Sequence, residues 1–380
     1  MLPLAHAEAI SAIDLCVDVK EPLKARWSPT LARCRQGRYF WLDNVREPAM
    51  QHRKFGGTGL TVSNICLGTM TFGLQTDEAE SRAILDRAAE SGVNFIDVAD
   101  VYPLGGEIAL AGRTEEIVGR WLKGKRHRFI VATKAVGKMG EAAWDQGASR
   151  KHLLDAIDAS LKRLGVDHVD LYQLHSDDRE TPLDETIEAL DTIVRSGRAR
   201  YVGVSNFLAY RLARALGRAD ALRLTRFVSV QPRYNLLFRQ IERELLPLAR
   251  EERLAVIPYN PLAGGLLTGK YKLDQTPNEG RFTQTVGKAG ALYRDRYWRE
   301  REFATIETLR GLAESSGLSL AKFALAWTLA NPAVTSAILG ASRAAQLDDT
   351  LPAADITLSA DVKAAADEAT AEYRWGDAAR

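Results

Sequence analysis

Short apolar segments alternate with longer segments of helical periodicity along most of the chain. The apolar segments lie at residues 65–68, 95–97, 129–133, 169–174, 201–204, 227–230, 254–258 and 335–339. Each is almost continuous in its apolar residues, which is typical of strands buried on both faces in a parallel sheet. The pattern therefore predicts eight strands separated by helices.

The segments between these strands carry the start and stop signals of amphipathic helices. After Ser149, a good helix-capping residue, apolar residues recur at three- and four-residue intervals until Gly165. A second helix is predicted to have Pro182 as its first helical residue and to end before Gly197. Residues 77–91 repeat the same scheme. Helices of this kind would cover the outer face of the sheet.

Eight strand–helix units favour a closed (β/α)8 barrel, the TIM barrel, over an open doubly wound sheet. The open sheet has a recognisable signature, which is a GxGxxG turn after the first strand and an acidic residue about twenty positions later. Residues 69–73 follow the first strand, read Thr-Met-Thr-Phe-Gly and lack this turn. The predicted fold class is therefore α/β, of the TIM-barrel type.

The N-terminal part of the chain reads differently. Residues 1–49 show neither a strand period nor a helix period and stay unassigned. Residues 55–62 are rich in glycine, as in a β-hairpin. We expect the barrel domain to span residues 50–380, and residues 1–49 to be an N-terminal extension, either an appendage or the product of a start site placed too early.

Composition narrows the class of partner. A formal net charge of +2 gives no global field that would attract nucleic acid or an anionic membrane. No apolar run reaches the roughly 18 residues of a membrane span, and the N-terminus lacks the basic region of a secretory signal. Cys16, Cys34 and Cys66 show no metal-ligand spacing. We therefore expect a cytoplasmic protein with no bound metal, no nucleic-acid partner and no membrane partner; the sequence is silent on oligomeric state.

Polar and titratable residues follow most of the predicted strands. Because the carboxyl ends of barrel strands meet at one mouth, the residues that follow them should lie together. They are Asp97 and Tyr102, Lys134, His175, Ser205 and Asn206, Gln231, and Tyr259. Each alone has an ordinary explanation, such as a snorkelling lysine, a buried histidine or a helix-capping aspartate. Their joint occurrence at consecutive strand ends favours an active site.

The first four of these residue positions suggest how a carbonyl could be reduced. A tyrosine has a pKa of about 10, and an ammonium about 4 Å away is worth roughly 4 kcal/mol, enough to lower that pKa by about three units. Tyr102 beside Lys134 would thus exchange a proton with an alkoxide. Asp97 would keep Lys134 charged, and His175 would donate a hydrogen bond to the carbonyl oxygen.

Several motifs in a fixed order make the chain resemble the aldo-keto reductase family from about residue 50 to about residue 350. The motifs are Gly92-Val-Asn-Phe-Ile-Asp-Val-Ala-Asp-Val-Tyr102, Ala132-Thr-Lys134, Asp170-Leu-Tyr-Gln-Leu-His175, Gly203-Val-Ser-Asn-Phe207, Gln231 with Tyr234 and Asn235, and residues 259–271. The resemblance, closest to the potassium-channel-β-subunit-like and aryl-alcohol-dehydrogenase-like branch, implies a (β/α)8 reductase that uses NADPH. It also implies a catalytic tetrad of Asp97, Tyr102, Lys134 and His175.

The same resemblance implies a set of cofactor contacts. Ser205, Asn206 and Gln231 match residues that hold the nicotinamide carboxamide, and Tyr259 matches the residue on which the ring stacks. Lys270 and Arg281 match basic residues near the phosphates. Ser342, Arg343 and Gln346 match residues near the 2′-phosphate and adenine. The implied contact set is completed by Pro261, Leu262, Gly264, Gly340 and Asp349.

Three departures from the family pattern stand out. Residues 103–114 lengthen the loop after Tyr102, Thr350 stands where relatives often have Asn, and Ser176, Asp177 and Asp178 form an acidic patch after His175. The aromatic residues proposed to line a substrate pocket are Phe72, Tyr293, Trp298 and Trp375.

Three other functions compete with carbonyl reduction. The segment 264–270 fits the phosphate-loop pattern GxxxxGK, but Tyr271 replaces the Ser or Thr that would bind magnesium. Lys134 could form a Schiff base, although Asp97 would keep its amine charged. Some relatives keep the barrel and the cofactor yet serve as regulatory subunits of potassium channels. Our leading prediction is an NADPH-dependent reductase of a small aldehyde or ketone.

Overall fold

The structure is a computed structural model that describes residues 31–33, 39–41, 50–275, 277, 280–283 and 287–375. The chain divides into two compact units, residues 1–48 and 49–380. In the first unit, β1 (Leu31–Arg33) pairs with β2 (Tyr39–Trp41) in an antiparallel hairpin.

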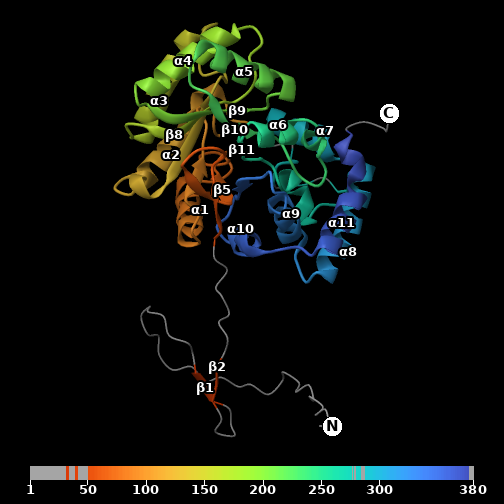
Figure 1. Cartoon of the computed structure of the whole chain (residues 1–380). Coiled ribbons are helices and arrows are strands. Elements are labelled where there is room, and N and C mark those ends of the chain that lie inside the picture. Colours follow the sequence, from red (N-terminus) through yellow and green to blue (C-terminus); the bar gives the residue numbers. More distant parts are fainter. Residues whose placement is uncertain are drawn as a thin grey trace, which may run out of the picture. The chain divides into compact units, whose positions relative to one another are not determined.

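The second unit is built on one sheet of eight parallel strands, drawn from orange to blue in Figure 1. In chain order they are β5 (Ile65–Gly68), β6 (Phe95–Asp97), β7 (Ile130–Ala135), β8 (Val169–Leu174), β9 (Ala199–Ser205), β10 (Phe227–Gln231), β11 (Ala255–Val256) and β12 (Ala337–Gly340). Neighbours in sequence are neighbours in the sheet, and β12 pairs with β5. The backbone N–H of Ile338 donates to the Pro258 carbonyl at 2.8 Å, which closes the ring. The predicted (β/α)8 barrel is confirmed.

Helices surround these strands. Those that follow β5 to β10 are α1 (Glu78–Glu90), α2 (Arg113–Leu122), α3 (Arg150–Leu164), α4 (Leu183–Arg195), α5 (Ala209–Leu222) and α6 (Leu245–Glu251). The C-terminal part adds α7 (Gly287–Tyr297), α8 (Glu300–Ser315), α9 (Leu320–Leu329), α10 (Gln346–Thr350) and α11 (Ala360–Ala369). Helices α8 and α11 lie side by side at one edge of the barrel (Figure 1). The apolar residues of α1 to α6 and of the outer strand faces form one large core, and those of α7, α8, α11 and most of α9 form a second cluster.

The predicted capping residues begin and end their helices as expected, with one exception. The Ser149 side chain accepts from the backbone N–H of His152, and Gly165 ends α3 with φ at 64°, a conformation that glycine adopts without strain. Helix α4 begins at Leu183, one residue later than predicted, because Pro182 has an extended ψ of 129°.

The inner faces of the strands change from apolar to polar along the barrel axis. Successive inward residues of a strand are two apart, so Phe95 and Asp97 point into the barrel from β6, and Ala132 and Lys134 from β7. The apolar residues form the lower part of the interior. The polar residues form a layer above them, at the carboxyl ends of the strands.

A hairpin closes the lower end of the barrel. Strands β3 (His52–Lys54) and β4 (Thr61–Ser63) pair in antiparallel fashion, which confirms the predicted hairpin. Phe55, in the connection between them, is fully buried, and its ring packs edge-on against Phe95 with a centroid separation of 5.8 Å. The barrel interior is therefore filled at this end.

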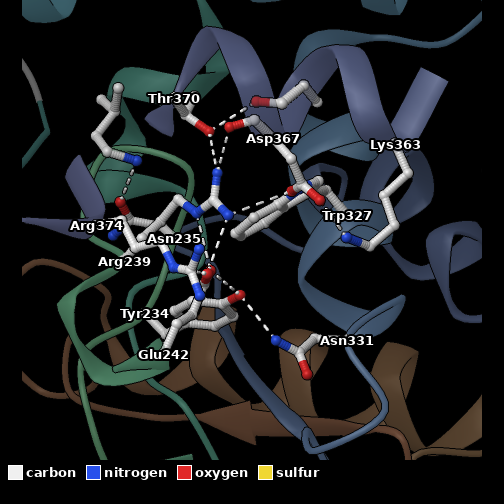
Figure 2. Close-up of polar contacts among 12 residues, drawn as sticks. Tyr234, Asn235, Arg239, Glu242, Trp327, Asn331, Lys363, Asp367, Thr370 and Arg374 are labelled. Atoms are coloured by element: carbon white, nitrogen blue, oxygen red, sulfur yellow. Dashed lines mark hydrogen bonds and ion pairs between the residues drawn. The ribbon is translucent and has the colours of Figure 1, made fainter. Parts of the chain in front are cut away.

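A polar network fastens the C-terminal helix to the segment after β10 (Figure 2). Arg239, 5% exposed, lies at its centre and pairs with Glu242 at 2.8 Å. The Arg239 guanidinium also donates to the Asp367 carbonyl and the Thr370 hydroxyl, at 2.7 and 2.9 Å. Trp327 of α9 donates to the Asp367 carboxylate at 2.8 Å. The network joins three segments that are far apart in sequence.

Candidate active site

Lys134 is the centre of the polar layer inside the barrel. Its side chain is fully buried, and its ammonium lies 2.5 Å from a carboxylate oxygen of Asp97. The same ammonium donates to the Val98 carbonyl at 2.8 Å and to the Tyr102 hydroxyl at 3.3 Å. Burial acts to lower the pKa of Lys134, but Asp97 and Tyr102 together raise it above its usual range. The amine therefore stays charged at neutral pH.

The second carboxylate oxygen of Asp97 is held by two amides. Gln231 donates to it at 2.9 Å, and Gln173 donates to it at 3.2 Å. Sequence reasoning assigned no role to Gln173. Its position on β8 indicates a side chain that points into the barrel, because Gln173 lies two residues after the inward-facing Leu171. These contacts fix the carboxylate that pairs with Lys134.

The rings of Tyr102 and His175 contact each other. Their ring centroids are 5.6 Å apart in an edge-to-face arrangement. The four side chains predicted to form the tetrad therefore lie in one cluster at the carboxyl ends of β6, β7 and β8. The backbone carbonyl of Tyr102 accepts from Gly112, so the longer loop of residues 103–114 folds back onto the tyrosine.

The expected effect of Lys134 on Tyr102 is corrected by the structure. Burial raises the pKa of the Tyr102 hydroxyl, and the neighbouring Lys134 ammonium only partly offsets that rise, in part because Asp97 adds negative charge. The prediction of a lowered pKa was wrong because it left out the cost of desolvating a phenolate. Tyr102 is a protonated phenol at neutral pH.

His175 is an uncharged imidazole in this site. Burial, together with the positive charge of Lys134, lowers its pKa from 6.5 to about 3. A neutral imidazole keeps one N–H donor. The backbone carbonyl of His175 accepts from the Asn206 side chain at 2.9 Å, which joins the ends of β8 and β9.

One cavity of about 630 Å³ opens above this cluster. It is lined by Asp97, Tyr102 and His175 together with nearly all residues predicted to bind the cofactor: Ser205, Asn206, Gln231, Tyr259, Pro261, Leu262, Gly264, Lys270, Arg281, Gly340, Ser342, Gln346 and Asp349. Lys134 lies beneath the cavity. Arg343, the remaining predicted contact, is exposed and does not line it.

A chain of side-chain hydrogen bonds orders one wall of the cavity. The Tyr259 hydroxyl donates to the Asn206 side-chain oxygen at 2.9 Å, and the Asn206 amide donates to the Ser205 hydroxyl at 3.1 Å. Asn206 has a φ of 59°, in the left-handed region that asparagine tolerates better than most residues. The hydroxyl and amide groups of Ser205, Asn206 and Tyr259 therefore line the cavity next to the tetrad.

The loop from Tyr259 to Gly265 is held from below by Tyr297. The buried Tyr297 hydroxyl accepts from the side-chain amides of Asn235 and Asn260, at 3.0 and 2.9 Å. The Asn260 side-chain oxygen accepts from the backbone N–H of Gly264. A Cβ on Gly264 would lie 2.6 Å from the Tyr293 ring, so only glycine fits there. Asn235, Asn260 and Tyr297 were not predicted as site residues.

The far end of the cavity carries the predicted phosphate-binding residues. The Gln346 side-chain oxygen accepts from the backbone N–H groups of Ser342 and Arg343, at 2.9 and 3.3 Å. The carboxylate of Asp349 accepts from Ser319 at 2.6 Å. Thr350 is buried and donates to the Gln346 carbonyl, so its hydroxyl is already used within the protein.

The predicted aromatic substrate pocket was largely wrong. Only Tyr293 lines the cavity; Phe72 is fully buried, and Trp298 packs between Phe282 and Phe303. Trp375 is 53% exposed and lies over Arg243. Aromatic residues on long loops were used here for packing.

Two other sequence features prove to be structural. Asp177 of the acidic patch pairs with Arg211 at 2.9 Å, and Asp178 accepts from the backbone N–H of Ala148 at 2.7 Å. The GxxxxGK segment forms a 3-10 helix (Ala263–Thr268) instead of a phosphate loop followed by an α-helix.

Within the described residues, no group of three or more His, Cys, Asp or Glu side chains is placed to hold a metal ion. No helix in this part of the chain is both long and apolar enough to cross a membrane.

Comparison with known proteins agrees with this geometry. Residues 64–371 match the sequence profile of the Aldo/keto reductase family. The chain belongs to that family. It is 39% identical over 320 residues to the uncharacterized oxidoreductase YrpG of Bacillus subtilis, which covers 82% of this chain and 94% of that protein.

Other relatives within the aldo/keto reductase family carry different names. The chain is 36% identical to a probable voltage-gated potassium channel subunit beta of Arabidopsis thaliana, over 81% of this chain and 92% of that protein. It is 35% identical to the L-glyceraldehyde 3-phosphate reductase of Escherichia coli K12, over 82% of this chain and 90% of the relative. The family is that of oxidoreductases, and its reductases act on carbonyl groups.

Proposed function

We propose that this protein reduces an aldehyde or ketone to an alcohol with NADPH, and that Tyr102 supplies the proton. The observation that supports this most is the position of the Tyr102 hydroxyl, 3.3 Å from a buried ammonium at the floor of a cavity. The same cavity is lined by the candidate nicotinamide-binding residues Ser205 and Asn206. A proton donor and a hydride donor would thus meet at one carbonyl group.

The chemical character of the cavity fits a dinucleotide. Amide and hydroxyl groups lie at the tetrad end, where Tyr259 offers a ring for stacking. Lys270 and Arg281 line the cavity farther along, and their charges suit phosphates. When bound, NADPH supplies the hydride that the protein itself lacks. NADPH is preferred over NADH in this proposal because Ser342, Arg343 and Gln346 match the family's 2′-phosphate contacts.

The tetrad residues have separate tasks in the proposed reaction. As negative charge develops on the substrate oxygen, the Tyr102 hydroxyl donates its proton, and the Lys134 ammonium is already in place to stabilise the resulting phenolate. Asp97 keeps Lys134 charged through the 2.5 Å ion pair. His175, as a neutral imidazole, donates a hydrogen bond that orients the carbonyl.

Turnover with a reactive aldehyde tests this proposal. We expect purified protein to oxidise NADPH in the presence of 4-nitrobenzaldehyde, measured as loss of NADPH absorbance. Tyr102→Phe removes the proton donor, so kcat should fall by at least about 100-fold, while the Kd for NADPH stays within about twofold. Comparable activity in the variant would remove Tyr102 as the acid.

A regulatory role is the second candidate, because some relatives are named as potassium channel β subunits. Tight NADPH binding with no turnover of any aldehyde or ketone would favour it. Schiff-base chemistry at Lys134 is disfavoured, since a charged amine is a poor nucleophile. Borohydride should therefore fail to trap a substrate adduct on Lys134. A cytoplasmic location remains part of the proposal and is testable by cell fractionation.

A further inference from the structure

A second cavity, of about 390 Å³, adjoins the first one at the barrel mouth. It lies between the loop that follows β9 and the segment that follows β10. Asn206, Tyr259 and Arg296 line both cavities, so the two spaces share a wall. The two cavities therefore adjoin at these three residues.

Three arginines line this second cavity: Arg233, Arg243 and Arg296. In the part of the chain that the structure describes, none of them forms an ion pair with a carboxylate. Arg211, which is partly buried, pairs with Asp177, and the buried Arg239 pairs with Glu242. Of the three arginines of the second cavity, Arg233 and Arg296 are partly buried and Arg243 is exposed. The second cavity also has one carboxylate, Glu244, which is exposed. Its walls therefore carry an excess of positive charge.

All three arginines lie near aromatic rings, and Arg243 lies 5.0 Å from the Trp375 ring. The Arg233 guanidinium stacks on Phe238 at 3.5 Å from the ring centroid, and Tyr297 lies 5.8 Å away. Arg296 lies 5.9 Å from the Tyr293 ring and has a side-chain hydrogen bond with Tyr259. Stacking on Phe238 fixes the plane of the Arg233 guanidinium but leaves its N–H groups able to bind an oxyanion.

The charges of Arg233 and Arg296 act on Tyr259, which lines both cavities. Burial raises the pKa of Tyr259, and the charges of Arg296 and Arg233 oppose that rise. Both arginines are partly buried, so water screens their charges less than at the open surface. Partly buried cations without a protein counter-ion favour an anionic ligand.

We propose that the second cavity binds a carboxylate or phosphate group carried by the carbonyl substrate. This inference rests on the proposed function and narrows the substrate class to anionic aldehydes or ketones. The cofactor is a less suitable source of the anion, because Lys270 and Arg281 line the first cavity and not the second. Arg233 and Arg296 would bind the oxyanion, while the carbonyl group reaches Tyr102.

Matched pairs of aldehydes test the proposal. Short, medium and long ω-oxo acids are compared with their methyl esters, which have the same chain without the charge. We expect kcat/KM for at least one acid to exceed that of its ester by about tenfold or more, mainly through KM, because only the acid forms charge-assisted hydrogen bonds with the arginines. Equal values for every acid and its ester would overturn the proposal.

Variants of the arginines give the second arm. Arg233→Gln and Arg296→Gln should each lower the acid-to-ester ratio of kcat/KM by about tenfold, and Arg233→Lys should recover part of it. Arg250→Gln is the matched control: it removes the same charge from an exposed position on α6 that lines neither cavity, and it should leave the ratio unchanged. An equal loss for acid and ester in Arg233→Gln and Arg296→Gln would overturn the proposal.

Two measurements test whether the anion in the second cavity belongs to the substrate, to an independent anion site or to the cofactor. Inorganic phosphate should compete with the ω-oxo acid in the wild type; noncompetitive inhibition of acid and ester alike would indicate an independent anion site and overturn the proposal. The Kd for NADPH should be unchanged in Arg233→Gln, and a rise would reassign the arginine to the cofactor.

If no aldehyde is reduced at all, the proposed function fails; if esters and acids are reduced equally, only the inference fails.

Discussion

At the scale of single residues, the site depends on the buried pair of Lys134 and Asp97. Both side chains are almost completely removed from solvent, and each is the counter-ion of the other. A buried ion pair is a poor source of net stability, but loss of one partner leaves an uncompensated charge. The pair therefore makes the site sensitive to any change that removes one charge alone.

Lys134→Met should lower the free energy of unfolding by about 3–5 kcal/mol, because the Asp97 carboxylate then lacks its cation. Urea denaturation measures this change. The double variant Asp97→Asn/Lys134→Met removes both charges and should be more stable than Lys134→Met alone. A double variant that is less stable than either single variant would contradict the assigned pairing.

His175 gives the site a response to acid. Its pKa is about 3 in the folded protein and 6.5 when unperturbed, so between these values the unfolded chain binds a proton that the folded protein does not. Stability must therefore fall as the pH is lowered through this range. Because His175 is only partly buried, we expect a loss of about 1–2 kcal/mol.

The comparison of wild type with His175→Gln isolates this contribution. The variant should lose less stability between pH 6.5 and pH 3 than the wild type, as measured by thermal or urea unfolding at each pH. Other acid-sensitive groups are the same in both proteins and cancel. Identical pH profiles would mean that His175 accepts a proton as readily in the folded protein as in the unfolded chain.

At the scale of elements, the hydroxyl of Tyr297 in α7 supports the loop between β11 and the 3-10 helix that follows it. Tyr297 holds Asn235 and Asn260 beneath the loop that carries Tyr259. Tyr297→Phe keeps the ring and removes these two hydrogen bonds. Because the loop lines the proposed cofactor site, we expect the Kd for NADPH to rise about tenfold, with a smaller change in kcat.

Fluorescence titration with NADPH measures this prediction, and Tyr210→Phe is its control. Tyr210 lies on α5 with 58% of its surface exposed, so removal of its hydroxyl should leave the Kd unchanged. An unchanged Kd in Tyr297→Phe as well would show that the loop keeps its conformation without these bonds.

Some elements and contacts of this fold could be predicted from the sequence, and others could not. The strand segments, the hairpin and the caps of α1 and α3 were predictable because they depend on local signals, namely continuous apolar runs, glycine and capping residues. The cluster of Asp97, Tyr102, Lys134 and His175 was also predictable, since barrel topology brings strand ends together. What failed depended on distant partners: the desolvation of Tyr102, the packing of Phe72 and Trp298, and the hold of Gln173 on Asp97.

At the scale of the whole molecule, the C-terminal helix is secured through Arg239. Arg239→Met removes the buried cation of Glu242, which keeps only the exposed Arg374, and leaves the Asp367 carbonyl and the Thr370 hydroxyl without their donor, so we expect the free energy of unfolding to fall by about 3 kcal/mol. Hydrogen exchange should also become faster in residues 360–375. Arg374→Met is the control, because it removes a 46% exposed cation from the same Glu242. That change should cost less than about 1 kcal/mol.

The hairpin at the lower end of the barrel restricts the route by which ligands can reach the tetrad. Phe55 fills that end of the barrel interior, so in the proposed function the dinucleotide, the carbonyl substrate and the alcohol all enter and leave on the side of the Tyr102 hydroxyl. Because the proposed cofactor and substrate share that one end of the barrel, the binding and release of each would depend on the other.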